Sequence, residues 1–167
     1  ETLAAFRHQI AGEGPAERVL VANLAYDMAI RGEPAERVAE LARRALANGA
    51  LLAEETSESL TYYLAAWTLA LAEHPDEATG ELDAALAQAR DNGSALGFAM
   101  ATCVRSNVLY RRGLILEAEA DARNALEAAS AGAWQGGLPL AVGFLIDALV
   151  ERGRIDAATE VLEASGI

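Results

Sequence analysis

VLYRRGLILEAEADARNALEAASAG (Val108–Gly132) has the same plan as ALVERGRIDAATEVLEASG (Ala148–Gly166), which begins forty residues later. Each contains an apolar run, an Arg-Gly pair, a short break, and an acidic, alanine-rich segment that favours helix. Two weaker copies precede them, over Leu24–Leu46 and Ala66–Leu86. Such a repeated unit, with one helix on each side of a turn, is typical of helical-hairpin arrays.

The turns of the four copies set the period. Aligned in sequence, they fall at spacings of 42, 39 and 40 residues, at Gly32, His74, Gly113 and Gly153. Glycine ends a helix at low cost because it adopts the left-handed conformation easily. The second copy lacks the glycine, but the helix is expected to stop before Pro75, since the residue preceding proline disfavours the helical region.

The sequence therefore predicts an all-α fold, a right-handed superhelical array of about four antiparallel hairpins within a single domain over residues 1–167. A short helix over 1–11 would end a preceding repeat. The four expected hairpins span 15–48, 57–91, 94–131 and 137–165. Their first helices are expected at 15–31, 57–73, 94–112 and 137–152, and their second helices at 34–48, 75–91, 115–131 and 155–165. In the helix expected at 115–131, Glu119 and Arg123 are spaced for an i, i+4 ion pair, which would contribute little to stability.

Composition and charge narrow the range of functions. The chain is rich in alanine and leucine, the strongest helix formers, and only 5% aromatic. All 13 basic residues are arginine, which excludes mechanisms that need lysine. The net charge of −12 argues against direct nucleic-acid binding. Residues 51–100 hold nine acids and one arginine; a solvated face is the simpler interpretation and a docking face for a basic partner the alternative.

No set of residues specifies a reaction, so we expect no enzyme activity, no cofactor and no metal site. His8 and His74 lack neighbouring ligands at metal spacing and are interpreted as surface or turn residues. Cys103, the only cysteine, lies in an apolar helical run and is expected in the core. Trp134 either packs over a hairpin end or is an exposed contact residue.

The setting expected for the chain is the cytoplasm. No signal peptide is visible, and no uninterrupted apolar stretch is long enough for a membrane span. A single cysteine fits a reducing compartment. Because the sequence begins with Glu1 rather than methionine, we expect it to be a piece of a longer protein.

A column of polar residues runs through the otherwise apolar first helices. Six positions before each turn stand Tyr26, Thr68, Asn107 and Asp147. In a stack of repeats, one column of first-helix positions faces the concave groove, where a ligand or peptide would be read. Asn23, Tyr63, Thr102 and Arg105 would border this groove. The simpler alternative is that the column faces solvent in every repeat.

The repeats resemble tetratricopeptide repeats, although they are longer than that standard and lack its aromatic signature. That resemblance is carried by the texture of NVLYRRGLILEAEADARNALEAA (Asn107–Ala129). More narrowly, the stretch from Arg43 to Gly113 is similar to the helical-repeat region of large ATP-binding LuxR-type (MalT-like) bacterial transcription regulators. In that family an ATPase module precedes the repeats and a DNA-reading helix-turn-helix follows them. The present chain contains neither a P-loop nor a basic recognition helix, so neither activity carries over.

The resemblance implies a non-catalytic sensor or interaction module that binds an inducer, a peptide or a partner domain. DNA would be contacted only by another domain of the parent protein, and a homodimer is left open. The alternative is a structural spacer or oligomerisation segment without its own ligand. The sequence predicts that Tyr26, Asn107 and Asp147 share one concave surface if the first interpretation holds.

Overall fold

The computed structural model describes residues 13–166. The helix predicted over 1–11, and His8 with it, lie outside the described residues. Every regular element in the described part is a helix, which confirms the all-α prediction. The α-helices are α2 (Pro15–Ile30), α3 (Ala35–Leu46), α4 (Ala50–Glu55), α5 (Leu60–Leu71), α6 (Pro75–Asp91), α7 (Ala95–Arg111), α8 (Ile115–Ser130), α9 (Leu138–Glu151) and α10 (Ile155–Ser165).

The ends of the eight predicted helices that the structure describes lie within three residues of their predicted positions, but the sequence did not predict α4. The connection predicted over Asn48–Ser59 contains a 3₁₀ turn, Ala47–Gly49, followed by α4. This segment folds because Leu51 and Leu52 are buried and supply a hydrophobic anchor for a single helical turn. A second 3₁₀ turn, Gln135–Gly137, precedes α9. None of the described helices has the length and apolar character needed to cross a membrane.

The tight turns depend on residues with left-handed backbone, and one of them differs from the prediction. Gly32, Gly113 and Gly153 have φ of 72°, 77° and 69°. In the second turn the left-handed residue is Glu73, with φ of 66°, and not His74. The spacing from Gly32 is then 41, 40 and 40 residues from one left-handed position to the next. A helix stop at this turn therefore depends on Glu73 as well as on Pro75.

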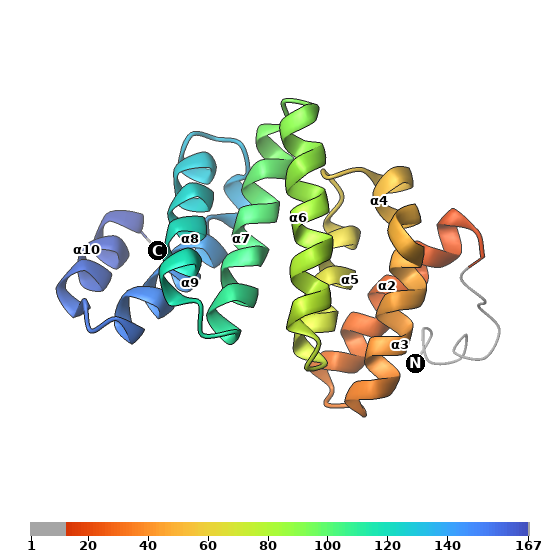
Figure 1. The fold of residues 1–167 in the computed structure, drawn as a ribbon. Helices are drawn as coiled ribbons and strands as arrows, with labels where there is room; N and C mark the ends of the chain where they lie inside the picture. Colours follow the sequence, from red (N-terminus) through yellow and green to blue (C-terminus); the bar gives the residue numbers. More distant parts are fainter. Residues whose placement is uncertain (1–12, 167) are drawn as a thin grey trace. The chain divides into compact units, whose positions relative to one another are not determined.

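Two compact units make up the chain, the first ending at Glu81 and the second beginning at Leu82, within α6 (Figure 1). In the first unit, α5 packs against α2 and α3. Its core holds two adjacent tyrosines, Tyr62 and Tyr63, whose rings meet edge to face at 5.6 Å. The Tyr62 hydroxyl donates to the Glu81 carbonyl at 2.7 Å, so a buried polar group ties α5 to α6.

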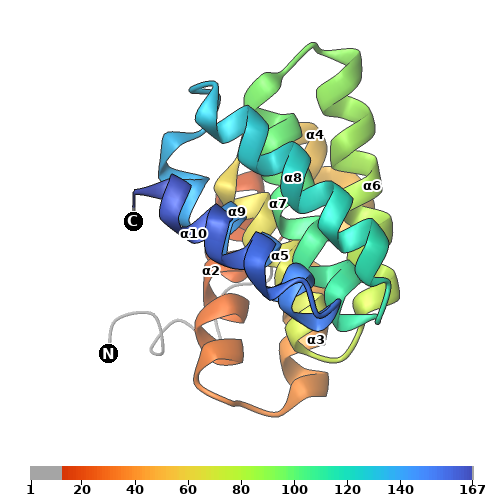
Figure 2. The same ribbon diagram turned by 90° about the vertical axis from the view of Figure 1, so that its left-hand side faces the viewer.

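In the second unit, α7 packs on α8, α8 on α9, and α9 on α10 (Figure 2). Its core combines small side chains with a few leucines, in two clusters bridged by partly buried Leu126 and Phe144. The fully buried members are Cys103, Ala122, Ala125, Ala141, Leu145, Leu149 and Ala158. Alanine at the contacts allows the helix axes to approach closely.

Candidate functional site

Three of the seven residues predicted to line a groove are buried instead. The Tyr63 hydroxyl donates to the Ser57 carbonyl at 2.8 Å. The hydroxyls of Thr68 and Thr102 donate to carbonyls four residues earlier in their own helices, at 2.7 and 2.8 Å. Their hydrogen bonds are satisfied inside the two cores, and burial removes all three from any surface that a ligand could reach.

The remaining four predicted residues are at least partly accessible. Tyr26 is half-buried, with its ring 6.2 Å from that of Trp67, in the first unit. Asn107 is half-buried and Asp147 exposed, both in the second unit. Arg105 donates to Asp121 at 2.6 Å and to Asp83 at 2.5 Å, so it links α7 to α8 and α6. A concave surface shared by Tyr26, Asn107 and Asp147 stays a prediction, since these residues belong to different units.

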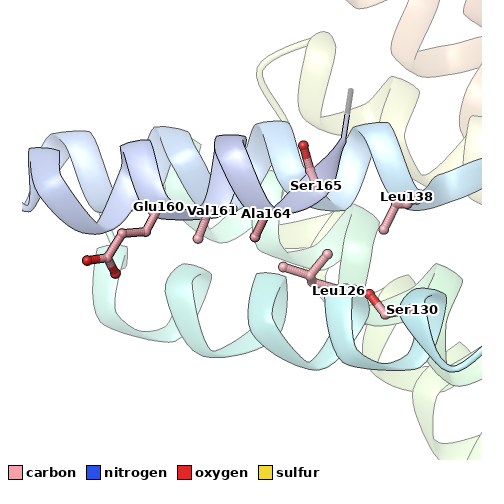
Figure 3. A pocket seen from close by; sticks show the side chains of 7 residues that line it. All are labelled: Leu126, Ser130, Leu138, Glu160, Val161, Ala164 and Ser165. Carbon is pink, nitrogen blue, oxygen red and sulfur yellow. The ribbon is translucent and has the colours of Figure 1, made fainter.

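A cleft of about 510 Å³ lies in the second unit between α8 and α10 (Figure 3). This volume is in the range of pockets that bind small molecules or single side chains of a partner. Val161 and Ala164 point from α10 toward Leu126 on α8, and these side chains form an apolar centre. The lining is completed by Ser130, Leu138, Glu160 and Ser165.

The cleft exists because α10 is attached mainly through α9. Only one residue of α10, Ala158, is fully buried. One to two helical turns further on, the side chains that face α8 are Val161 and Ala164, which are too short to fill the space above Leu126. The apolar walls therefore remain open to solvent along the seam between the two helices.

At the other end of this seam, a buried carboxylate holds α10 in register with α8. Glu119, on α8, has a side chain only 2% exposed. It accepts hydrogen bonds from Arg123 on α8, from Arg152, and from Arg154 at 3.0 Å. Arg152 and Arg154 flank Gly153 in the turn between α9 and α10. We call Arg123, Arg152 and Arg154 the arginine cluster.

The surroundings of Glu119 correct the prediction of a minor i, i+4 pair. Burial alone would raise the pKa of this carboxyl group, but the hydrogen bonds from Arg152 and Arg123 outweigh it and hold the pKa below the ordinary 4.5. Two of its three partners lie 33 and 35 residues away in sequence. The ion pair of Glu119 and Arg123 is thus part of a larger ionic network that connects α8 to the turn of the next hairpin.

The remaining candidates for chemistry stay within the structural roles predicted for them. Cys103 is buried, which raises the pKa of its thiol to about 12. Half-buried Trp134 packs against Cys103, Ala125 and Ala141, which confirms the packed alternative. His74 lies at a turn, with Nδ1 at 3.1 Å from Glu77 and 3.0 Å from Arg43. Within residues 13–166, no group of three or more His, Cys, Asp or Glu side chains is placed to hold a metal ion.

Comparisons with known proteins found no matching protein family, no similar curated protein and no similar solved structure. The site is therefore defined by the geometry of this chain alone. Sequence reasoning missed the cleft, although a signal was present. Its lining repeats at i, i+4 in two helices, with Leu126 and Ser130 on α8 and Val161 and Ser165 on α10.

Proposed function

We propose that this chain is a non-catalytic interaction module, a right-handed superhelical array of tetratricopeptide-like hairpins with a period near 40 residues. In this proposal it serves as the sensor region of a cytoplasmic, LuxR-type bacterial transcription regulator. The observation that carries the interaction role is the apolar cleft between α8 and α10. Its occupant is an apolar side chain of a partner peptide.

A peptide fits the cleft for two reasons. The apolar lining is short, formed mainly by Leu126, Val161 and Ala164, and matches one or two side chains rather than a long segment. The seam also continues along α8 toward the arginine cluster, where a peptide could extend beyond its anchor residue. Apolar anchors in pockets with a polar surround are typical of the residues that dominate binding energy.

The test uses the complete chain and a random peptide library, followed by affinity measurements on the selected peptides. Ala164 is exposed and lines the cleft, so Ala164→Arg fills the cleft without disturbing the core. Ala84→Arg, at an exposed position of α6 outside the cleft, is the control with the same added charge. We expect selected peptides to share an apolar residue and to lose at least about tenfold in affinity to Ala164→Arg only.

Two outcomes would overturn the proposal. One is that no peptide family is selected; the other is that both arginine variants bind the selected peptides equally well. A small molecule that shifts the methyl resonances of Leu126 and Val161, without any peptide doing so, would replace the peptide by an inducer as the occupant.

A spacer or oligomerisation segment is the second candidate, and a different observation favours it. Four large apolar side chains on α9 and α10 are exposed, and stacking by another copy of the chain would cover some of them. They are Leu140, Val150, Ile155 and Leu162. Under this alternative, sedimentation equilibrium shows a dimer that Leu162→Glu dissociates; a monomer at all concentrations speaks against it.

A further inference from the structure

The arginine cluster has more positive than negative groups in direct ion-pair contact. Three guanidinium groups share one carboxylate, Glu119, so these four ion-paired groups together carry a charge of +2. The structure records no other carboxylate in ion-pair contact with these three groups within residues 13–166. This is unusual in a chain with 25 acids and 13 arginines. At Arg105 the numbers are reversed, because this single arginine contacts two carboxylates, Asp83 and Asp121.

Each guanidinium of the cluster also keeps donors for a second anion. All three contact Glu119 through Nη1. A guanidinium has five N–H donors in a planar fork, so each arginine has more donors than its contact with Glu119 uses. The side chains of Arg123, Arg152 and Arg154 are 48%, 35% and 46% exposed, so an anion in solvent can approach all three.

The three groups are also held in place before any ligand arrives. Glu119 is fixed in a buried position on α8, and the left-handed Gly153 places Arg152 and Arg154 on the two sides of one turn. Long arginine side chains normally lose entropy when they bind an anion. Here the buried carboxylate already restricts them, so less conformational freedom is lost on binding.

The cluster adjoins the apolar cleft. Arg123 precedes the cleft residue Leu126 by three positions on α8, a rise of about 4.5 Å along the helix axis. An acidic side chain next to an apolar anchor in a peptide therefore spans the distance between the two. Glu160 lines the cleft as well and opposes an incoming negative charge.

We infer that Arg123, Arg152 and Arg154 form an oxyanion subsite, which takes the carboxylate of an acidic residue in the peptide whose apolar residue fills the cleft. This inference rests on the proposed function. Guanidinium groups bind carboxylates through paired, charge-assisted hydrogen bonds, which add direction to the attraction. The subsite fixes the direction in which the peptide lies along the seam between α8 and α10.

The first arm of the test compares two forms of a selected peptide, one with the acidic residue and one with the corresponding amide. We expect the amide form to bind about tenfold more weakly to the native chain, the loss of one charge-assisted contact. Arg154→Gln should remove this preference. Arg90→Gln, which changes the net charge equally at an exposed site on α6, should preserve it, and Glu160→Gln should enlarge it. Equal binding of both peptide forms to the native chain overturns the inference while leaving the proposed function intact.

The second arm needs no peptide and separates the two proposals if the selection fails. Inorganic phosphate is titrated into the complete chain at low ionic strength, and the arginine Nε–Hε resonances are followed by NMR. We expect saturable shifts of Arg123, Arg152 and Arg154, which are lost in Arg154→Gln and kept in Arg90→Gln. Shifts that are absent, or equally present in Arg154→Gln, overturn the subsite whatever the peptides show.

Discussion

Replacing Glu119 by glutamine should destabilise the second unit much more than the same change at an exposed glutamate. The side-chain shape is kept, so packing is unchanged. The charge is lost, and the new amide group presents N–H donors to guanidinium groups that are donors themselves. The buried position offers these amide hydrogens no acceptor among the arginines that surround it.

The magnitude follows from the exposure of the partners. The three arginines are a third to a half exposed and can return to water, so each lost ion pair is worth roughly 0.2–1 kcal/mol. A buried donor left unsatisfied adds roughly 1–3 kcal/mol. The free energy of unfolding should therefore fall by about 3 kcal/mol. With a urea dependence near 2 kcal/mol/M, the midpoint falls by about 1.5 M.

The assay is urea unfolding followed by tryptophan fluorescence. Each unit contains one of the two tryptophans, so a Trp67→Phe background makes Trp134 report on the second unit alone. Glu127→Gln, on the exposed side of α8, is the control and should change stability by less than about 0.5 kcal/mol. A Glu119→Gln effect no larger than that of Glu127→Gln would refute the reasoning.

Three further predictions concern the same unit. The difference in unfolding free energy between the native chain and Glu119→Gln should be constant above about pH 6 and shrink as the pH falls below about 4.5. The reason is that Glu119, whose pKa is lowered in the folded chain, stabilises the fold only while it is ionised. Urea midpoints between pH 3 and 7 measure this difference, and a difference that does not change with pH contradicts the prediction. Gly137→Ala should cost roughly 1–3 kcal/mol, since a Cβ there would overlap the Trp134 ring, and should shift the Trp134 emission. Gly136→Ala, where a Cβ meets no atom within 4 Å, should have little effect, and equal losses in both variants would argue against the overlap. The Cys103 thiol should resist a disulfide reagent at pH 8 until the chain is unfolded, because with a pKa of about 12 only about one group in 10⁴ is a thiolate; rapid labelling of the folded chain would show that the thiol is accessible.

Local signals in the sequence were sufficient for the helices. Apolar runs, prolines at helix starts and left-handed glycines act within a few residues, so the ends of α8 and α10 fall within a residue of the prediction. The second turn was misplaced by one position because a left-handed Glu73 has no marker in the sequence. The short helix α4 was missed because one turn of helix has too few residues to show a period.

The groove prediction failed at three of its seven residues, Thr68 of the polar column and Tyr63 and Thr102 beside it, and for the two threonines the physical reason is local. A threonine hydroxyl in a helix can donate to the carbonyl four residues earlier, and it then packs in a core as readily as an apolar group. Thr68 and Thr102 do this, so polarity in the sequence did not indicate exposure. The tie between Glu119 and Arg154 depends on how two hairpins pack, which no local spacing reveals.

Helix α10 is held by one buried alanine and, at its beginning, by the ion pairs of Glu119 with Arg152 and Arg154. This weak attachment also determines how the helix moves. With so little apolar surface to expose, its amide hydrogens should exchange with solvent through local openings that cost far less than unfolding of the whole unit. We expect these openings to begin at the far end of the helix, around Ser165, and to stop near the turn at Gly153, where the arginine cluster holds the helix start. A molecule that occupies the cleft contacts the part that opens most readily, so slowed amide exchange in α10 becomes a direct measure of occupancy.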